Sequence, residues 1–154
     1  MPFAPPELRP FARLSIAVAS PIEVGDIGAG DRRVIAITGG TVEGPAIRGR
    51  VLPGGADFQV IRPSGLTELQ ARYVIETEDG ALVYVENNGL RFGPPEALER
   101  IRRGEPVDPA LIYFRSTPRF ETAAPAYRWL MHRLFVATGA RHPDRVELAV
   151  FEVG

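Results

Sequence analysis

The sequence predicts a mainly β protein, built as a closed antiparallel barrel or a β-sandwich with one or two short helices. About eight or nine short runs of alternating or β-branched residues are separated by glycine and proline turns, a pattern typical of both architectures. The clearest run is Thr67–Glu78, in which apolar and polar residues alternate throughout. Asp79-Gly80 follows as a hairpin turn, so Ala81–Asn87 is expected to return antiparallel to that strand.

Shorter patterns predict the remaining elements. Residues 1–10 hold four prolines and no hydrophobic period, so we expect a lead-in to a single domain that spans residues 11–154. Gly39-Gly40 is expected to be a turn. Pro94–Arg103 predicts an α-helix, because proline opens it, acidic residues lie early, arginines lie late and a glycine follows. Further strands are expected over 11–19, 32–38, 46–52, 56–62, 110–116, 134–138 and 145–153, and a second short helix over 124–133.

Length and composition restrict the class of protein. The 154 residues suffice for one domain with a real core, and a hydrophobic content of 45% is typical of globular chains. All basic residues are arginine, yet the formal net charge is only −1, which gives no general attraction to nucleic acid or anionic lipid. Without cysteine there is no disulfide and no thiolate nucleophile, and no segment has the apolar length of a membrane helix. We therefore expect a cytoplasmic protein with no membrane and no nucleic-acid partner.

The motifs of several enzyme classes are missing from the sequence. A phosphate-binding P-loop needs a lysine, and the chain has none. None of its serines lies in the Gly-x-Ser-x-Gly turn of the α/β-hydrolases. The two histidines, His132 and His142, belong to no metal-binding pattern, so we expect no metal and no cofactor.

The stretch Thr38–Asp57 is the most unusual in composition and carries the main site hypothesis. It holds six glycines among its twenty residues, which indicates backbone in conformations closed to other residues or backbone that approaches something closely. Two carboxylates, Glu43 and Asp57, lie within this frame. We interpret the stretch as the rim and upper wall of a small-molecule pocket.

Several segments together resemble a known family. TGGTVEGPAIRGRVLPGGAD, ARYVIETEDGALVYVENNG, YFRSTPRFET with AYRWL, and a closing strand ending in FEV are similar, in this order and spacing, to the domain-of-unknown-function family 3237, also called uncharacterised protein family 0311. The similarity runs from about Leu14 to the C-terminus. It implies a single-domain antiparallel β-barrel related in shape to calycin-like and allene-oxide-cyclase-like barrels. It implies no activity, because the family has no catalytic assignment that could be transferred to these residues.

The candidate catalytic residues are Glu43, Asp57 and Arg115. If both carboxylates face the barrel mouth, mutual repulsion and burial would separate their pKa values, as acid–base catalysis requires. The alternative for Asp57 is that it accepts hydrogen bonds from its own glycine turn. Arg115 lies between aromatic residues and is expected either to stack or to clamp an anion, with Glu121 as the partner in a plain ion pair otherwise.

Four further residues are candidates for lining a ligand site. Arg72 shares a strand face with Glu76, and alternation alone does not tell whether that face is solvated or lines the barrel. Tyr73 lies on the opposite face, which is the better core candidate. Tyr113 and Trp129 are expected to be core aromatics or to line a ligand, since both roles use buried positions.

Two functions remain open from the sequence. The first is a cofactor-independent lyase, isomerase or cyclase that uses acid–base chemistry on a small organic molecule. The second is a non-catalytic barrel that binds or carries a small hydrophobic ligand in an apolar interior. In either case we expect a homo-oligomer, most simply a dimer, because both faces of strands such as Arg145–Val153 are rather apolar.

Overall fold

The computed structural model describes residues 2–154, which form one ten-stranded antiparallel sheet with three short helical segments. The strands are β1 (Leu8–Val18), β2 (Ile22–Asp26), β3 (Asp31–Glu43), β4 (Arg48–Val51), β5 (Ala56–Ile61), β6 (Thr67–Thr77), β7 (Leu82–Phe92), β8 (Tyr113–Thr122), β9 (Leu134–Arg141) and β10 (Arg145–Val153). The helical segments are the α-helix α1 (Pro95–Arg102) and the 3₁₀ helices η1 (Pro109–Leu111) and η2 (Pro125–His132).

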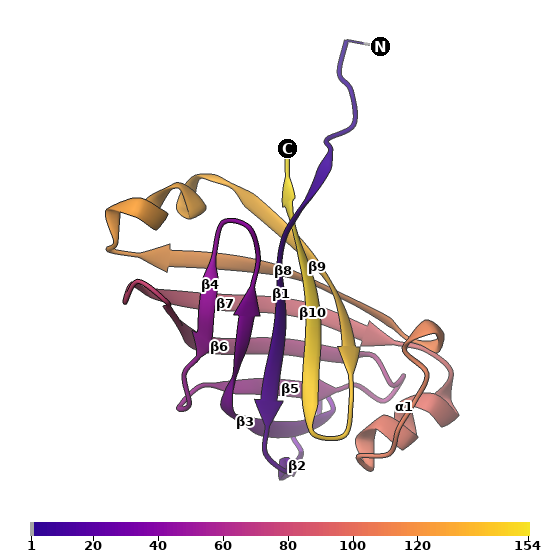
Figure 1. Ribbon diagram of the computed structural model, residues 1–154. Helices are drawn as coiled ribbons and strands as arrows, with labels where there is room; N and C mark the ends of the chain where they lie inside the picture. The colour runs from indigo at the N-terminus through magenta and orange to yellow at the C-terminus, as the bar shows by residue number, and fades with distance from the viewer. Residues whose placement is uncertain (1) are drawn as a thin grey trace.

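The sheet closes on itself as an eight-position barrel. Pairing runs from β1 through β10, β9, β8, β7 and β6, and β1 also pairs with β3, which returns to β6 through β4 and β5. The strands β4 and β5 share one position, because both lie between β3 and β6 at successive heights. Likewise, β1 and β2 pair with successive halves of β3. The closed barrel predicted from the sequence is confirmed (Figure 1).

Gly39-Gly40 lies inside β3 rather than in the expected turn. It marks the point at which β3 changes partners, from β2 and β5 on its first half to β1 and β4 on its second. A Cβ atom built on Gly40 would lie 2.2 Å from the carbonyl oxygen of Ser15 on β1. The pair of glycines therefore lets one long strand bend and pass close to β1, instead of ending a short one.

Burial follows the two-residue period of the strands. On β6 the odd-numbered side chains face the barrel interior, and among them Leu69, Tyr73 and Ile75 are buried, as the alternation predicted. On β8 it is the even-numbered side chains, such as Phe114 and Phe120, that are buried. On each strand, whether odd-numbered or even-numbered residues face inward therefore determines which side chains line the interior.

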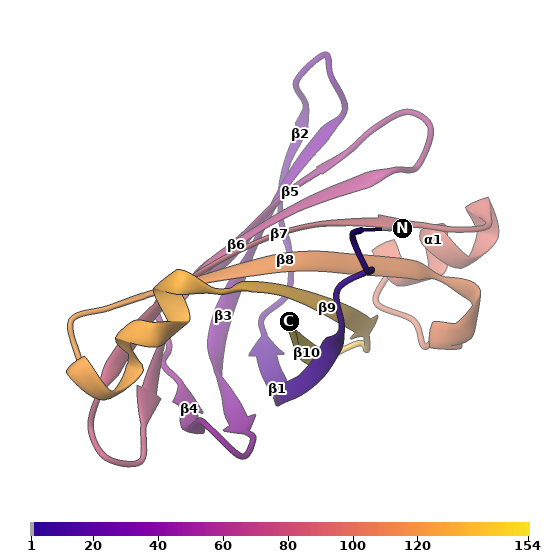
Figure 2. The same cartoon turned by 90° about the horizontal axis from the view of Figure 1, so that it is seen from above.

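The helical segments lie at opposite ends of the barrel (Figures 1 and 2). α1 and η1 both belong to the connection from β7 to β8, and η2 connects β8 to β9. The expected helix Pro94–Arg103 is confirmed to within one residue at each end, whereas the expected helix over 124–133 is a 3₁₀ helix. Among the described residues, no helix is long and apolar enough to span a membrane.

An aromatic cluster fills the end of the barrel beside η2. The ring of Phe135 lies 4.8 Å from that of Phe11 and 4.9 Å from that of Phe120 between centroids. Trp129 of η2 packs edge-on against Phe11 at 5.9 Å. These rings come from the start of β1, the end of β8 and the start of β9, so the opposite ends of these strands form the other mouth.

Two other boundaries differ from the sequence expectation. β1 begins at Leu8, inside the expected lead-in of residues 1–10, because the backbone of Leu8–Pro10 pairs with the last residues of β10. The strand expected over 110–116 is divided into η1 and β8, since the Asp108 side chain caps a short 3₁₀ turn that begins at Pro109.

The close passage of β3 and β1 predicts a large difference between two glycine variants. Gly40 and Gly54 both have positive φ, at +149° and +107°, but nothing lies within 4 Å of a Cβ built on Gly54. Gly54→Ala is expected to lower the free energy of unfolding by about 1–2 kcal/mol through backbone strain. Gly40→Ala is expected to cost at least about 2 kcal/mol more, because β1 must also move. Urea unfolding of both variants measures the difference, and equal losses would contradict the close approach.

Candidate functional site

Polar side chains gather inside the barrel, away from the aromatic cluster. They border a cavity of about 40 Å³ whose other walls are apolar, formed by aliphatic residues of β1, β3, β6 and β10 and by Phe114 of β8. The polar members of the lining are Asp57, Gln59, Tyr73, Asn87, Arg91, Ser116 and Arg141. Buried polar groups are costly unless they are satisfied, so a cluster of them inside a barrel is a candidate site.

Asp57 is held at the centre of this cluster by β5 and β6. Its Oδ2 accepts a hydrogen bond of 2.8 Å from the Gln59 side-chain amide, and its Oδ1 accepts one of 3.1 Å from the backbone N–H of Gln70. It therefore bonds across the sheet rather than to its own glycine turn. Burial raises the pKa of Asp57, and the bond from Gln59 offsets only part of this effect. The carboxyl group keeps its proton to a higher pH than an exposed aspartate would.

Arg91 carries a buried positive charge on β7. Only 3% of the residue is exposed, and its Nε has no hydrogen-bond partner among residues 2–154. Its guanidinium lies 5.7 Å from the centroid of the Phe114 ring, a cation–π contact. Burial lowers the pKa of Arg91 to about 10, so it is still charged at neutral pH.

Arg141 brings a second positive charge to the same cavity from the end of β9. Its Nη1 donates a 2.8 Å hydrogen bond to the carbonyl of His142. Burial lowers the pKa of Arg141, and the nearby charge of Arg33 adds to this lowering. Tyr73 is also buried here, and desolvation raises the pKa of its hydroxyl, which keeps it neutral.

Three further buried polar atoms of the cluster have no partner within the described part of the chain. They are Gln59 Oε1, Asn87 Oδ1 and Ser116 Oγ. The two amide oxygens accept hydrogen bonds, and the hydroxyl can donate or accept. Because native proteins satisfy most buried polar atoms, these groups indicate that something else meets them.

Two inward-facing glycines leave space beside these groups. A Cβ on Gly139 would lie 2.7 Å from atoms of the Phe114 ring, so the ring lies directly against the backbone of β9. A Cβ on Gly89 would lie 2.7 Å from that of Ser116. Side chains at either position would displace the neighbours that shape the cavity.

A larger pocket of about 470 Å³, which we call the vestibule, lies beside the cavity. It is formed by the β2–β3 hairpin, the β5–β6 turn and α1, and Arg91 borders both the vestibule and the cavity. The other arginines of the vestibule are Arg33, Arg62 and Arg102. Arg91 thus lies between the interior and the surface.

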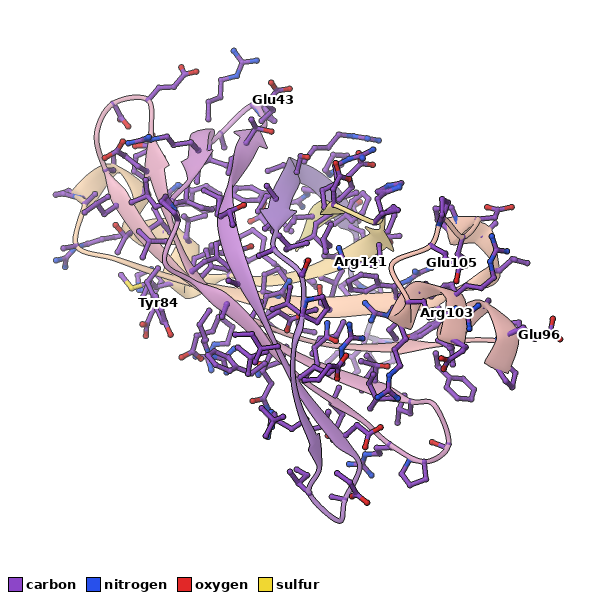
Figure 3. The ribbon with its side chains drawn as sticks, turned by 90° about the horizontal axis from the view of Figure 1, so that it is seen from below. Glu43, Tyr84, Glu96, Arg103, Glu105 and Arg141 are labelled. Atoms are coloured by element: carbon purple, nitrogen blue, oxygen red, sulfur yellow. The ribbon has the colours of Figure 1, made fainter. Side chains whose placement is uncertain are left out.

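The three candidate catalytic residues predicted from the sequence do not form one site. Asp57 lies inside the barrel, whereas Glu43 and Arg115 are exposed and border an outer groove that crosses β1, β9 and β10. Figure 3 shows Glu43 at the far end of β3, apart from Arg141. The expected pairing of Glu43 with Asp57 is corrected because odd residues of β3 before Gly39 face inward, and the partner change at Gly39-Gly40 reverses this for Glu43.

The predicted ligand-lining residues divide in the same way. Tyr73 lines the cavity, but Tyr113 is 57% exposed and Arg115 stacks on it outside the barrel, 5.2 Å from the ring centroid. Arg72 faces outward and donates a 3.0 Å hydrogen bond to Asn88 Oδ1. Glu121 is exposed, and across residues 2–154 it forms no ion pair with Arg115. Trp129 packs in the aromatic cluster instead of the cavity.

Sequence reasoning missed most of the polar cluster. Arg91, Asn87 and Ser116 were not singled out, although a signal for the first two was present. The Asp79-Gly80 hairpin sets β7 against β6, with Tyr73 opposite Val85, so the inward face of β7 continues through Asn87 to Arg91. On β8, the sequence pattern favours Arg115, which faces outward, over its neighbour Ser116, which faces inward.

In the described part of the chain, no group of three His, Asp or Glu side chains is placed to hold a metal ion. The chemistry that the cluster offers is proton transfer by Asp57 and stabilisation of negative charge by Arg91 and Arg141.

The raised pKa of Asp57 predicts a pH-dependent stability. The folded protein binds this proton more tightly than the unfolded chain, so the stabilisation is complete below the ordinary pKa of 3.8 and is lost as pH rises through the folded value. Asp57→Asn removes the titration. We expect its midpoint of thermal unfolding to exceed that of the wild type at about pH 7, and this advantage to shrink toward about pH 4.

The control for this measurement is Glu121→Gln, which removes an exposed carboxylate from β8. Comparison with this variant separates the effect at Asp57 from that of converting one surface carboxylate to an amide. Parallel stability curves for Asp57→Asn and the wild type would contradict a perturbed Asp57.

Relatives and solved structures match the chain over nearly its whole length. A protein named "UPF0311 protein" from Rhodopseudomonas palustris (strain TIE-1) is 60% identical over 129 residues, which cover 84% of each chain. A crystal structure of a conserved protein of unknown function from R. palustris has a TM-score of 0.93 at 51% identity, and covers 99% of each chain. A β-barrel-like protein from Acinetobacter baumannii has a TM-score of 0.87 at 39% identity, with 99% of this chain and 98% of that chain covered.

A more distant structure shares only the fold. It is described as an enzyme from Penicillium herquei, with a TM-score of 0.75 at 19% identity, and the match covers 99% of this chain and 97% of that one. The family model described as "Protein of unknown function (DUF3237)" matches residues 6–153. The chain therefore belongs to this family, whose curated relatives carry the name UPF0311 protein.

Proposed function

We propose that the barrel is a cofactor-independent enzyme of the lyase, isomerase or cyclase type, which uses Asp57 to move a proton on a small organic molecule. The observation that carries this proposal is a carboxyl group inside the barrel with a raised pKa, fixed by Gln59 beside the buried Arg91 and the half-buried Arg141. Perturbed carboxylates in a cavity are typical of general acids and bases.

The two hydrogen bonds to Asp57 suit it to this role. Gln59 and the backbone of Gln70 fix the plane of the carboxyl group, so a proton leaves or arrives in one direction. The raised pKa keeps a larger share of Asp57 protonated near neutral pH, which favours donation to a carbonyl oxygen or an alkene carbon. Once ionised, the same group accepts a proton from another position of the substrate.

The arginines supply the second requirement of such a reaction. Enolates, phenolates and carboxylates develop or carry negative charge on oxygen, and fixed cations in a water-poor site stabilise that charge. Arg91 and Arg141 both border the cavity that Asp57 lines. The structural likeness to a protein described as an enzyme is compatible with catalysis on this fold, without naming a reaction for this chain.

A carrier function is the second candidate, and the aliphatic walls of the cavity favour it. Seven of the lining residues are branched aliphatic side chains from β1, β3, β6 and β10, and Phe114 adds an aromatic ring. Such a lining suits a bound apolar group. A carrier needs affinity for its ligand but no proton transfer, so the two functions differ in an observable way.

Exchange of carbon-bound hydrogen distinguishes the two functions. The wild-type chain is incubated in deuterated water with a panel of small ketones, β-keto acids and unsaturated carbonyl compounds, and incorporation is followed by NMR. We expect faster exchange for at least one compound, and a loss of about 100-fold or more in Asp57→Asn, because general acid–base groups contribute about that much. Arg115→Met, an outward-facing change, should keep the wild-type rate.

Accelerated exchange that survives Asp57→Asn would show that another group moves the proton. Binding of panel members without any accelerated exchange would favour the carrier.

A further inference from the structure

Three of the four arginines that line the vestibule form ion pairs with carboxylates. Arg62 lies 2.6 Å from Glu68, Arg102 lies 2.9 Å from Asp31, and Arg33 lies 3.0 Å from Glu23. Arg91 is the exception, because within residues 2–154 no carboxylate lies within 4.0 Å of it. It is also fully enclosed, with 3% of its surface exposed.

Asp57 offsets the charge of Arg91 only in part. Gln59 and the backbone of Gln70 hold its two oxygens, no ion pair joins it to Arg91 among residues 2–154, and its raised pKa favours the uncharged form. The charge of Asp57 opposes part of the lowering of the Arg91 pKa, whereas the charges of Arg141 and Arg33 add to it. The cavity lining holds two arginines and one carboxyl group, so it carries an excess of positive charge even when Asp57 is ionised. A buried unpaired charge is strongly unfavourable, and a bound anion would relieve it.

The other unpartnered atoms narrow the chemistry of that anion. Asn87 Oδ1 and Gln59 Oε1 accept hydrogen bonds, so an O–H or N–H donor elsewhere on the ligand would satisfy them. The remaining lining is aliphatic, with Ile35, Leu69 and Val146 among its members. A ligand that satisfies all three features has an acidic group, a hydroxyl or amine donor and an apolar part.

The sizes of the two spaces indicate how such a ligand lies. The inner cavity of about 40 Å³ holds about three water-sized groups, which is a substituent rather than a whole substrate. The vestibule of about 470 Å³ accommodates the rest, and Arg91 borders both. An acidic group of the ligand that binds Arg91 would therefore lie between a small apolar group in the cavity and the larger part of the ligand in the vestibule.

We propose that the interior site binds a small organic monoanion, with its carboxylate or phenolate on Arg91 and a short branched apolar group in the cavity beside Asp57. The location of the reacting carbon beside Asp57 rests on the proposed function, whereas the binding of the anion does not. The substrate class is then an acid that also carries a hydroxyl or amine donor.

Matched pairs of charged and neutral probes test the proposal on the wild-type chain. Isobutyrate and isobutyramide share the three-carbon branched group, and benzoate and benzamide form a larger pair. We expect each acid to bind at least about tenfold more tightly than its amide, because charge-assisted hydrogen bonds to a buried guanidinium are the stronger ones. Titration followed by ¹H–¹⁵N NMR should place the shift changes at the amides of Asn87, Arg91 and Ser116.

Two arginine variants locate the anion. Arg91→Met removes the buried charge and keeps an unbranched apolar side chain, so the preference for the acid over the amide should disappear. Arg115→Met changes an exposed arginine on the outer face and should keep the wild-type preference. If Arg91→Met does not fold, the NMR shifts of the wild type still identify the site.

Inorganic phosphate tests whether the apolar part matters. Binding of phosphate as tight as that of isobutyrate, with the same shift changes, would overturn the organic ligand. Equal affinity for acids and amides, no binding of either acid, or a preference that persists in Arg91→Met would overturn the anion site.

The outcome is separable from that of the proposed function. Asp57→Asn should still prefer the acids, since it leaves Arg91 in place. Preferential binding of the acids without hydrogen exchange would support the anion site and contradict the enzyme. Asp57-dependent exchange confined to neutral ketones would support the enzyme and contradict the anion site.

Discussion

The pairing of β1 with β3 is the constraint on which the rest of the structure depends. It joins two edges of the sheet, so that one face of the long strands, β1, β3 and β6 to β10, is removed from water. The pairing requires the backbones of Gly40 and Ser15 to pass within a distance that a side chain would prevent. Once the barrel is closed, the parity of each strand decides which residues can form a site, and no loop is needed to build one.

The two ends of the barrel interior differ in packing and in polarity. At the η2 end, Phe11, Phe120 and Phe135 form a compact cluster whose ring contacts contribute beyond simple burial. This packing leaves the α1 end free to contain a cavity and polar groups that do not stabilise the fold by themselves. The candidate site therefore lies at the less well packed end, as expected where activity and stability make opposite demands.

Much of the fold followed from the sequence because local signals agreed with one another. The alternation of Thr67–Glu78, the Asp79-Gly80 turn and the helix pattern of Pro94–Arg103 each depend on residues near in sequence, and all three elements are present. The site was less accessible. Glycine clustering singles out Asp57, which lies inside the barrel, but Arg91, which lines the same cavity, follows only from counting parity through a hairpin. Glu43 shares the same glycine-rich stretch and lies outside, because the bend at Gly39-Gly40 reverses the parity within one strand, which local patterns do not reveal.

The charge content of the interior is the feature that a purely structural barrel would least retain. Replacing a buried ionic group by an apolar one of similar size is often neutral or stabilising, so selection for stability alone would remove Arg91. An aliphatic side chain at this position would also fill part of the cavity. Arg91 is instead kept between the cavity and the vestibule, with Asp57 and Arg141 lining the same space. A buried charge kept at this place is the observation from which we infer an anion site, and its position beside Asp57 is what connects that site to the proposed proton transfer.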